Sequence, residues 1–356
     1  MKINNYFPQK NILFLLLFFS SWITSCGRSN DENLNNNLSD LAVNIEIIGK
    51  SSSFINGDGT GVIKIFATAK NATSYNMRIG SDILSSQDGK FNYTVNNSGT
   101  NSYTIYVTAY NGDKSISNTT QITVYKAPKL LWSDEFDKDG LPDSTKWGYD
   151  TGNNNGWGNN ELEYYTNRQE NTNVSNGILK INLIKESYQG YNYTSARLLS
   201  KGKFSFKYGR VDIRAKLPSG GGTWPALWMI GDNITSAGWP ACGEIDIMEH
   251  VGNQLNKIFA TLHHPNHSGA NGDGGTVNIS NATSEFHIYS LDWSSNQIKF
   301  YVDNQLFYTF ANNSNLPFNQ NFFLIMNVAM GGNFGGTVDS NFTSSSMEID
   351  YVRVYQ

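Results

Sequence analysis

Short runs in which apolar and polar side chains alternate recur along most of this chain, and turn-forming residues separate them. In residues 210–217, the apolar Val211, Ile213, Ala215 and Leu217 alternate with charged side chains. A repeat of two places such apolar side chains on one face of a β-strand. Aromatic residues make up 13% of the chain, 33 residues are glycine, and no sustained run of helix-forming residues occurs. The pattern predicts an all-β chain and excludes long helices and coiled coils.

Residues 41–126 contain about six of these runs, separated by Gly, Asn and Asp. The runs are 42–48, 61–67, 74–79, 91–95, 103–110 and 121–125. This density of short strands is typical of a small β-sandwich. The segment resembles the immunoglobulin-like or PKD-like modules of secreted enzymes, and we expect it to be a spacer, with carbohydrate binding as the alternative.

The strand pattern continues beyond 126–129 (KAPK), which we interpret as a hinge. Many further strands between residues 130 and 356 favour one large antiparallel sandwich of the jelly-roll type. The chain also has 26 basic and 30 acidic residues, for a net charge of −4. Without a basic surface, nucleic-acid binding through phosphate contacts is excluded. Nothing in the sequence calls for more than a monomer.

The first 25 residues have the features of an export signal. Lysines precede the apolar run 12–19 (ILFLLLFF), which is shorter than the roughly 20 residues of a transmembrane helix. The segment 23–26 (ITSC) resembles a bacterial lipobox, which implies lipidation of Cys26 and attachment to a membrane. Residues 26–40 are rich in Asn and Ser and are predicted to be a flexible tether.

An acidic pair, Asp31 and Glu32, follows the predicted lipidation site. It resembles the surface-export signal of Bacteroidetes-type lipoproteins, so we expect an outer-membrane protein exposed at the cell surface. With Cys26 lipidated, the second cysteine, Cys242, has no intramolecular disulfide partner. Its neighbours favour a small packed residue over a catalytic thiol.

The segment 243–250 reads GEIDIMEH and combines three carboxylates with a strand pattern. On a regular strand Glu244 and Asp246 share one face, while Glu249 points to the other. A one-residue β-bulge at the two residues before Glu249 would return it to the same face. Grouped like charges raise the proton affinity of at least one carboxyl, which suits division into acid and nucleophile. A solvated acidic strand is the alternative.

This acidic strand resembles the signature of glycoside hydrolase family 16, in the bulged form with an inserted Met. Other segments agree in the expected order: 132–136 (WSDEF), 158–166 (GNNELEYYT), 224–229 (WPALWM), 238–243 (GWPACG) and 347–355 (MEIDYVRVY). The resemblance spans about residues 130–356 and is similar to the laminarinase branch, the endo-β-1,3-glucanases. It implies catalysis without a cofactor.

The resemblance also implies a role for each carboxylate. Glu244 would be the nucleophile, Glu249 the acid that protonates the leaving oxygen and then deprotonates water, and Asp246 a hydrogen-bonding partner of the nucleophile. The implied reaction is a retaining double displacement, which needs two working carboxyls roughly 5 Å apart. Retention therefore rests on the family and not on residue spacing.

Seven residues are candidates for sugar binding. Trp224 and Trp228 share a strand face, and a flat indole fits the apolar face of a pyranose ring; packing in the core is the alternative. Trp239, on a Gly/Pro-flanked loop, is a further candidate. The resemblance adds four more, of which the first two could instead be solvated surface residues: Asn160, Arg197, His263 and Asn327.

Two metal interpretations arise. The histidines at 263, 264 and 267 suggest zinc, but Pro and Gly nearby predict a loop, and no glutamate base is inserted, so we do not expect catalytic zinc. A structural calcium is the stronger candidate, since oxygen ligands suit calcium. The alternative is that its carboxylates are ordinary surface charges. The ligands that the resemblance implies are Glu135, the carbonyl of Gly177, and Asp350.

The sequence thus predicts a surface-anchored endo-glycosidase that hydrolyses internal β-1,3 bonds of laminarin-like β-glucans. A mixed-linkage β-1,3-1,4-glucanase and an agar-type galactan hydrolase are alternatives of the same class. A non-catalytic glycan-binding protein is the alternative of another class, although it would be marked by loss of Glu244 or Glu249, and both are present. A structural adhesin is the weakest alternative.

Overall fold

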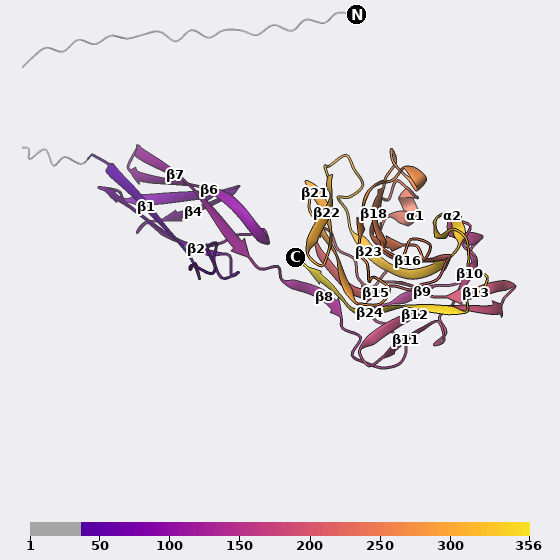
Figure 1. Ribbon diagram of the computed structural model, residues 1–356. Coiled ribbons are helices and arrows are strands. Elements are labelled where there is room, and N and C mark those ends of the chain that lie inside the picture. Colours follow the sequence, from indigo (N-terminus) through magenta and orange to yellow (C-terminus); the bar gives the residue numbers. More distant parts are fainter. Residues whose placement is uncertain (1–36) are drawn as a thin grey trace, which may run out of the picture. The chain divides into compact units, whose positions relative to one another are not determined.

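The computed structural model describes residues 37–356, so the predicted export signal, Cys26 and most of the tether lie outside the described residues. The prediction of an all-β chain is confirmed, because almost all regular structure is β-strand (Figure 1). The chain divides into two compact units, the larger of which includes residues 121–356. Within residues 37–356, no helix has the length and apolar character needed to cross a membrane.

The strands before residue 127 form a three-stranded sheet with the order β1-β2-β5 and a four-stranded sheet with the order β4-β3-β6-β7. Apolar side chains of both sheets are buried, including Ile65, Met77 and Val107. The strands are β1 (Ser39–Ile47), β2 (Val62–Lys70), β3 (Ser74–Ile79), β4 (Asp82–Ser86), β5 (Lys90–Thr94), β6 (Gly99–Asn111) and β7 (Lys114–Lys126).

Two details of this region differ from the sequence prediction. Strand β1 begins at Ser39, two residues inside the predicted tether. Strand β4 was not predicted, because its sequence, DILSS, has only two apolar residues and its burial is partial. The immunoglobulin-like or PKD-like identity of residues 41–126 and the boundary at 126–129 stay predictions.

The larger region contains a ten-stranded sheet with the order β10-β13-β12-β24-β15-β20-β21-β22, while β11 pairs with β12 and β8 pairs with β24. Its strands are β8 (Leu130–Asp134), β10 (Glu163–Tyr165), β11 (Thr172–Ser175), β12 (Ile178–Tyr188), β13 (Tyr191–Ser195), β15 (Gly209–Lys216), β20 (His287–Trp293), β21 (Gln297–Val302), β22 (Gln305–Ala311) and β24 (Ser344–Tyr355).

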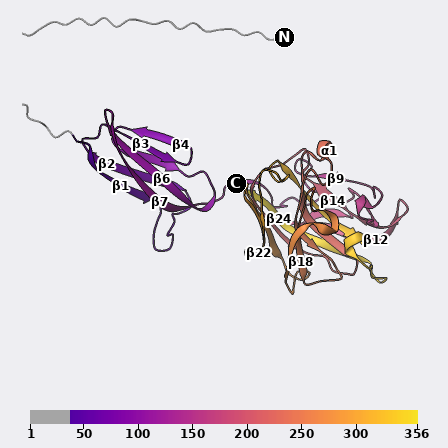
Figure 2. The same ribbon diagram turned by 90° about the horizontal axis from the view of Figure 1, so that it is seen from above.

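A seven-stranded sheet with the order β19-β18-β17-β16-β23-β14-β9 lies against it, as two perpendicular views show (Figures 1 and 2). Its strands are β9 (Gly148–Asp150), β14 (Arg197–Leu199), β16 (Thr223–Gly231), β17 (Glu244–His250), β18 (Lys257–His263), β19 (Asp273–Asn278) and β23 (Phe322–Met330). The short helices are η1 (Gly156–Gly158), α1 (Ile234–Ala237), η2 (Gly269–Asn271) and α2 (Gly332–Gly335).

The main core lies between these two sheets and includes the predicted apolar face of β15, with Val211 and Ile213 fully buried. Strand β23 is buried along its whole length, and its side chains alternate between two clusters. Leu324 belongs to the main core, whereas Phe323 and Ile325 belong to a second cluster on the opposite face of the sheet. The predicted jelly-roll sandwich is confirmed, and the other face of the seven-stranded sheet carries a second cluster of buried side chains.

Candidate active site

Strand β17 contains the predicted β-bulge. Asp246 is opposite Thr261 and Glu249 is opposite Phe259, so three steps along β17 match only two along β18. The same extra residue appears against β16, where Leu227 pairs with Met248 and the next residue pairs with Asp246. The bulge therefore brings Glu249 to the face that carries Glu244 and Asp246.

The extra residue is accommodated by the core. Ile245, Ile247 and Met248 are all buried in the main cluster, although the last two are adjacent in sequence. A regular strand would place one of two adjacent residues on each face. Burial of both is the energetic reason for the bulge, since each buried apolar side chain contributes roughly 1.5–3 kcal/mol.

Each of the two glutamates accepts a hydrogen bond from a tryptophan. Trp239 Nε1 donates to Glu244 Oε2 at 2.7 Å, and Trp224 Nε1 donates to Glu249 Oε1 at 3.0 Å. Thr261 Oγ1 donates to the other oxygen, Glu249 Oε2, at 3.0 Å. The indoles that the sequence suggested for sugar binding thus also hold the carboxylates in place.

His263 lies opposite Glu244 on the neighbouring strand β18. Its Nε2 is 3.2 Å from Asp246 Oδ2 and 4.0 Å from Glu244 Oε1. The imidazole is therefore the one basic side chain within 4 Å of this carboxylate group among the described residues. Within residues 37–356, no lysine or arginine forms an ion pair with any of the three acids.

The pKa values of the three carboxyls are all raised. Desolvation is the largest cause for each one. Repulsion from Asp246 raises the pKa of Glu244 further, and repulsion from Glu249 does the same for Asp246. The hydrogen bonds from Trp224 and Thr261 partly offset the rise at Glu249. Clustered, desolvated carboxyls of this kind retain a proton at higher pH, as an acid catalyst must.

Arg197 lies on the same sheet in β14, which β16 and β23 separate from β17. Its guanidinium is 4.6 Å from the ring centre of Trp157 and 4.8 Å from that of Trp228. Its Nε is 3.2 Å from Asp150 Oδ2. Between two indoles and a carboxylate, Arg197 is held in a defined orientation.

The amide of Asn327 is used within the protein. Its Oδ1 accepts from Trp228 Nε1 at 2.8 Å, and its Nδ2 donates to Tyr165 Oη at 3.0 Å. Tyr165 in turn donates to Glu161 Oε2 at 2.9 Å. Asn327 is 6% exposed, so the structure places it as a support for Trp228. Asn160 donates to Asn333 Oδ1 at 2.7 Å, which joins its turn to the short helix α2.

Several residues of this site were missed from the sequence. Thr261, Asp150, Trp157 and Tyr165 each contact a predicted site residue. The alternation along β18 could have indicated Thr261, because it shares a face with His263. The other three lie on β9, η1 and β10, separate segments whose approach to Arg197 and Asn327 local periodicity does not show.

The three implied calcium ligands come from segments that all neighbour β24. Both carboxylates are nevertheless paired with arginines: Arg353 donates to Glu135 at 3.0 and 2.8 Å, and Arg214 donates to Asp350 at 2.5 Å. Both carboxylates thus lie in ion pairs, and calcium binding by Glu135, Gly177 and Asp350 stays a prediction.

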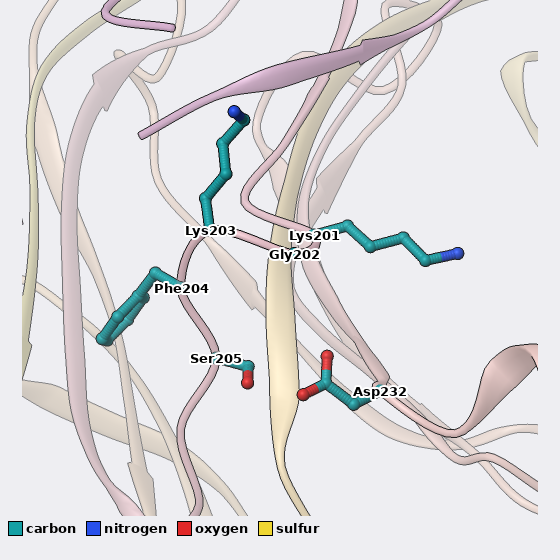
Figure 3. Close-up of a pocket in the computed structure, with 6 residues that line it drawn as sticks. All are labelled: Lys201, Gly202, Lys203, Phe204, Ser205 and Asp232. Carbon is teal, nitrogen blue, oxygen red and sulfur yellow. The ribbon is translucent and has the colours of Figure 1, made fainter. Parts of the chain in front are cut away.

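Two other features of the larger region do not belong to the predicted active site. Cys242 is fully buried, and desolvation together with the charge of Glu244 raises its pKa to about 11, which confirms a packed, unreactive thiol. A surface pocket lies elsewhere, and in it Lys201 and Lys203 point away while Ser205 faces Asp232 (Figure 3). It contains none of the predicted site residues.

Comparisons with known proteins agree with this geometry. The family model described as "Glycosyl hydrolases family 16" matches residues 159–353. A "Beta-glucanase" of Rhodothermus marinus is 48% identical over 249 residues, covering 65% of this chain and 87% of the relative. A "Glucan endo-1,3-beta-glucosidase A1" of Niallia circulans is 40% identical over 257 residues, covering 64% of this chain and 38% of the relative. The solved laminarinase of Rhodothermus marinus matches with a TM-score of 0.62 and 47% identity, covering 64% of this chain and 97% of that chain.

Proposed function

The chain belongs to glycosyl hydrolases family 16 and is a glycoside hydrolase, and on this premise we propose that it cleaves internal β-1,3-glucosidic bonds of laminarin-like polysaccharides. The observation that carries the proposal is the bulge in β17. It places Glu244, Asp246 and Glu249 on one face, where indole N–H groups hold both glutamates.

In the first step, a carboxylate oxygen of Glu244 attacks the anomeric carbon as the bond from that carbon to the glycosidic oxygen breaks. Glu249 transfers its proton to the leaving oxygen, so a free sugar hydroxyl departs and a glycosyl ester forms on Glu244. This division of roles follows the family's double displacement. Asp246 and His263, both near Glu244, orient the nucleophile.

In the second step, Glu249 removes a proton from water, and the resulting hydroxide attacks the same carbon. The ester bond breaks, Glu244 leaves as a carboxylate, and the anomeric configuration is retained after two inversions. Glu249 is protonated again at the end. No cofactor enters either step.

The substrate assignment rests on the relatives and on the aromatic residues of the site. Both relatives reported above are named for β-glucan hydrolysis, one of them for the 1,3 linkage. Trp224, Trp228 and Trp239 are each partly exposed or exposed, so their ring faces are available to stack on pyranose rings while their N–H groups bind protein partners.

Reducing-sugar release by the purified chain on laminarin, mixed-linkage glucan and agarose tests the proposal, with Glu244→Gln as the control. We expect release from laminarin that is lost in the control. Faster hydrolysis of mixed-linkage glucan or of agarose would replace the proposed substrate by one of these polymers. Binding of laminarin without hydrolysis would contradict catalysis.

We also propose, from the sequence of residues 1–40, that the protein is exported and anchored in the outer membrane through lipid on Cys26. Incorporation of labelled fatty acid in a native-type host, compared with Cys26→Ala, tests the anchor. Digestion of intact cells with protease tests surface exposure. A wild-type chain that takes up no label would contradict the lipid anchor. A chain that is protected from protease on intact cells would contradict surface exposure.

A further inference from the structure

Two histidines and an aspartate meet at the loop end of the β18–β19 hairpin, and none of them belongs to the group of three catalytic carboxyls. His264 directly follows β18, and Asp273 is the first residue of β19. His264 Nε2 lies 2.9 Å from Asp273 Oδ2, and His267 Nδ1 lies 2.8 Å from Asp273 Oδ1. The carboxylate thus lies between the two imidazoles.

Backbone and packing hold this group in place. The N–H of His264 donates to the carbonyl of His267 at 2.8 Å, and the reverse bond measures 2.9 Å. The ring of His264 contacts Phe310 and Phe318, and its side chain is 6% exposed. The side chain of His267 is 51% exposed and that of Asp273 25%, so the group is rigid on one side and accessible on the other.

The donor atoms suit a divalent transition metal. One ligand atom from each side chain lies within 4.8 Å of the other two. Tetrahedral zinc with bonds of about 2.0–2.2 Å needs such atoms about 3.4 Å apart, which a small rotation of the accessible His267 can provide. Two imidazole nitrogens and one carboxylate oxygen favour Zn²⁺ over Ca²⁺, which prefers oxygen ligands alone.

We propose that His264, His267 and Asp273 form a structural Zn²⁺ site, with water as the fourth ligand. Zinc would close the loop between β18 and β19, which contains η2. Gly272 of this loop packs on the catalytic-face histidine, since a Cβ there would come within 2.8 Å of His263 Cε1. The metal would therefore brace a loop that borders the active site without taking part in hydrolysis.

Metal binding would displace protons from this group. Both oxygens of Asp273 face imidazole nitrogens, at 2.9 and 2.8 Å. Zinc would replace the two N–H protons that now lie between the imidazoles and the carboxylate, and these protons would pass to solvent or to the other ring nitrogens.

The test is a titration of the purified, chelator-treated chain with Zn²⁺ and, separately, Co²⁺. We expect one Zn²⁺ per chain, a rise of about 5 °C in Tm at saturating zinc, and a visible absorption band of tetrahedral Co²⁺. His267→Gln removes an accessible ligand, so the fold is retained, and it should weaken zinc binding by at least about tenfold.

Two matched controls make the outcome decisive. Glu244→Gln disrupts the other metal-capable group found within residues 37–356, which comprises Glu244, Asp246 and His263. His287→Gln removes a histidine that pairs with one carboxylate, Asp303, at 2.6 Å. Both should retain zinc binding. No binding by the wild-type chain, undiminished binding by His267→Gln, or loss of binding in Glu244→Gln would overturn the proposal.

Discussion

Two groups of carboxylates in the larger region have opposite surroundings. On or beside the ten-stranded sheet, Glu135 is paired with Arg353, Asp350 with Arg214, and Glu348 with Lys216. On the seven-stranded sheet three acids are grouped, and indole N–H groups, a hydroxyl and one histidine are their partners.

The ion-paired carboxylates favour stability, whereas the grouped carboxyls favour catalysis. A carboxylate paired with arginine is kept ionised, as the lowered pKa of Glu135 shows. Grouped carboxyls without a cation keep protons at higher pH, at the expense of folding free energy. A nucleophile and an acid can coexist only in the second arrangement. Four predictions test this difference.

The largest effect is expected from removing one of the grouped glutamates. Glu244→Gln or Glu249→Gln should lower kcat on laminarin by at least about 10³-fold, because the nucleophile or the proton donor is lost. Glu348→Gln, on the ten-stranded sheet, is the matched control and should change kcat less than about twofold. A comparable loss of kcat in Glu348→Gln would contradict the difference between the two groups of carboxylates.

A smaller effect is expected from removing one indole N–H. Trp224→Phe keeps an aromatic ring but deletes the donor to Glu249, so the pKa of Glu249 rises. Because Glu249 must be protonated for the first step, the basic limb of the pH profile of kcat/KM should move to higher pH. Trp228→Phe deletes a donor to Asn327 instead and should leave that limb in place. A shift of the basic limb in both variants, or in neither, would contradict control of the Glu249 pKa by the Trp224 N–H group.

The grouped acids should also reduce stability. Burial and Asp246 raise the pKa of Glu244 in the folded state, so the carboxyl opposes folding above its unfolded pKa of about 4.3 and ceases to do so below it. Glu244→Gln should therefore raise Tm by about 3 °C at pH 7 and by much less near pH 4. Calorimetry at both pH values checks this, and a lower Tm at pH 7 would disprove it.

The smallest effect is expected beside the ten-stranded sheet, where a substitution should lower the stability of the fold instead of raising it. The hydrogen bond from Arg353 lowers the folded pKa of Glu135, so its stabilisation is present above the unfolded pKa and is lost as pH falls through the folded value. The pair is partly exposed, so Glu135→Gln should cost under about 1 kcal/mol at pH 7. Urea unfolding at pH 7 and pH 3 measures it. A cost that persists at pH 3 would indicate a role other than the ion pair.

The order of residues alone predicted most of the acidic strand. Glu244 and Asp246 are two apart, so they share a face, and the five-residue step to Glu249 required a bulge if all three were to meet. The pairing of β17 with β16 and β18 confirms that bulge. Sugar binding by Asn327 stays a prediction, and the sequence did not show that Trp228 and Tyr165 engage its amide.

Residue order was enough to predict the sandwich class, most of the strands and the acidic strand, because alternation reports the local geometry of one strand. Tertiary structure decided which side chains meet. Trp224 and Trp239 reach the glutamates through β16 and a loop, and Asp273 reaches His264 through the pairing of β18 with β19. These partners are far apart in sequence or lie across a turn, so strand register and loop path, which local periodicity does not encode, set their distances.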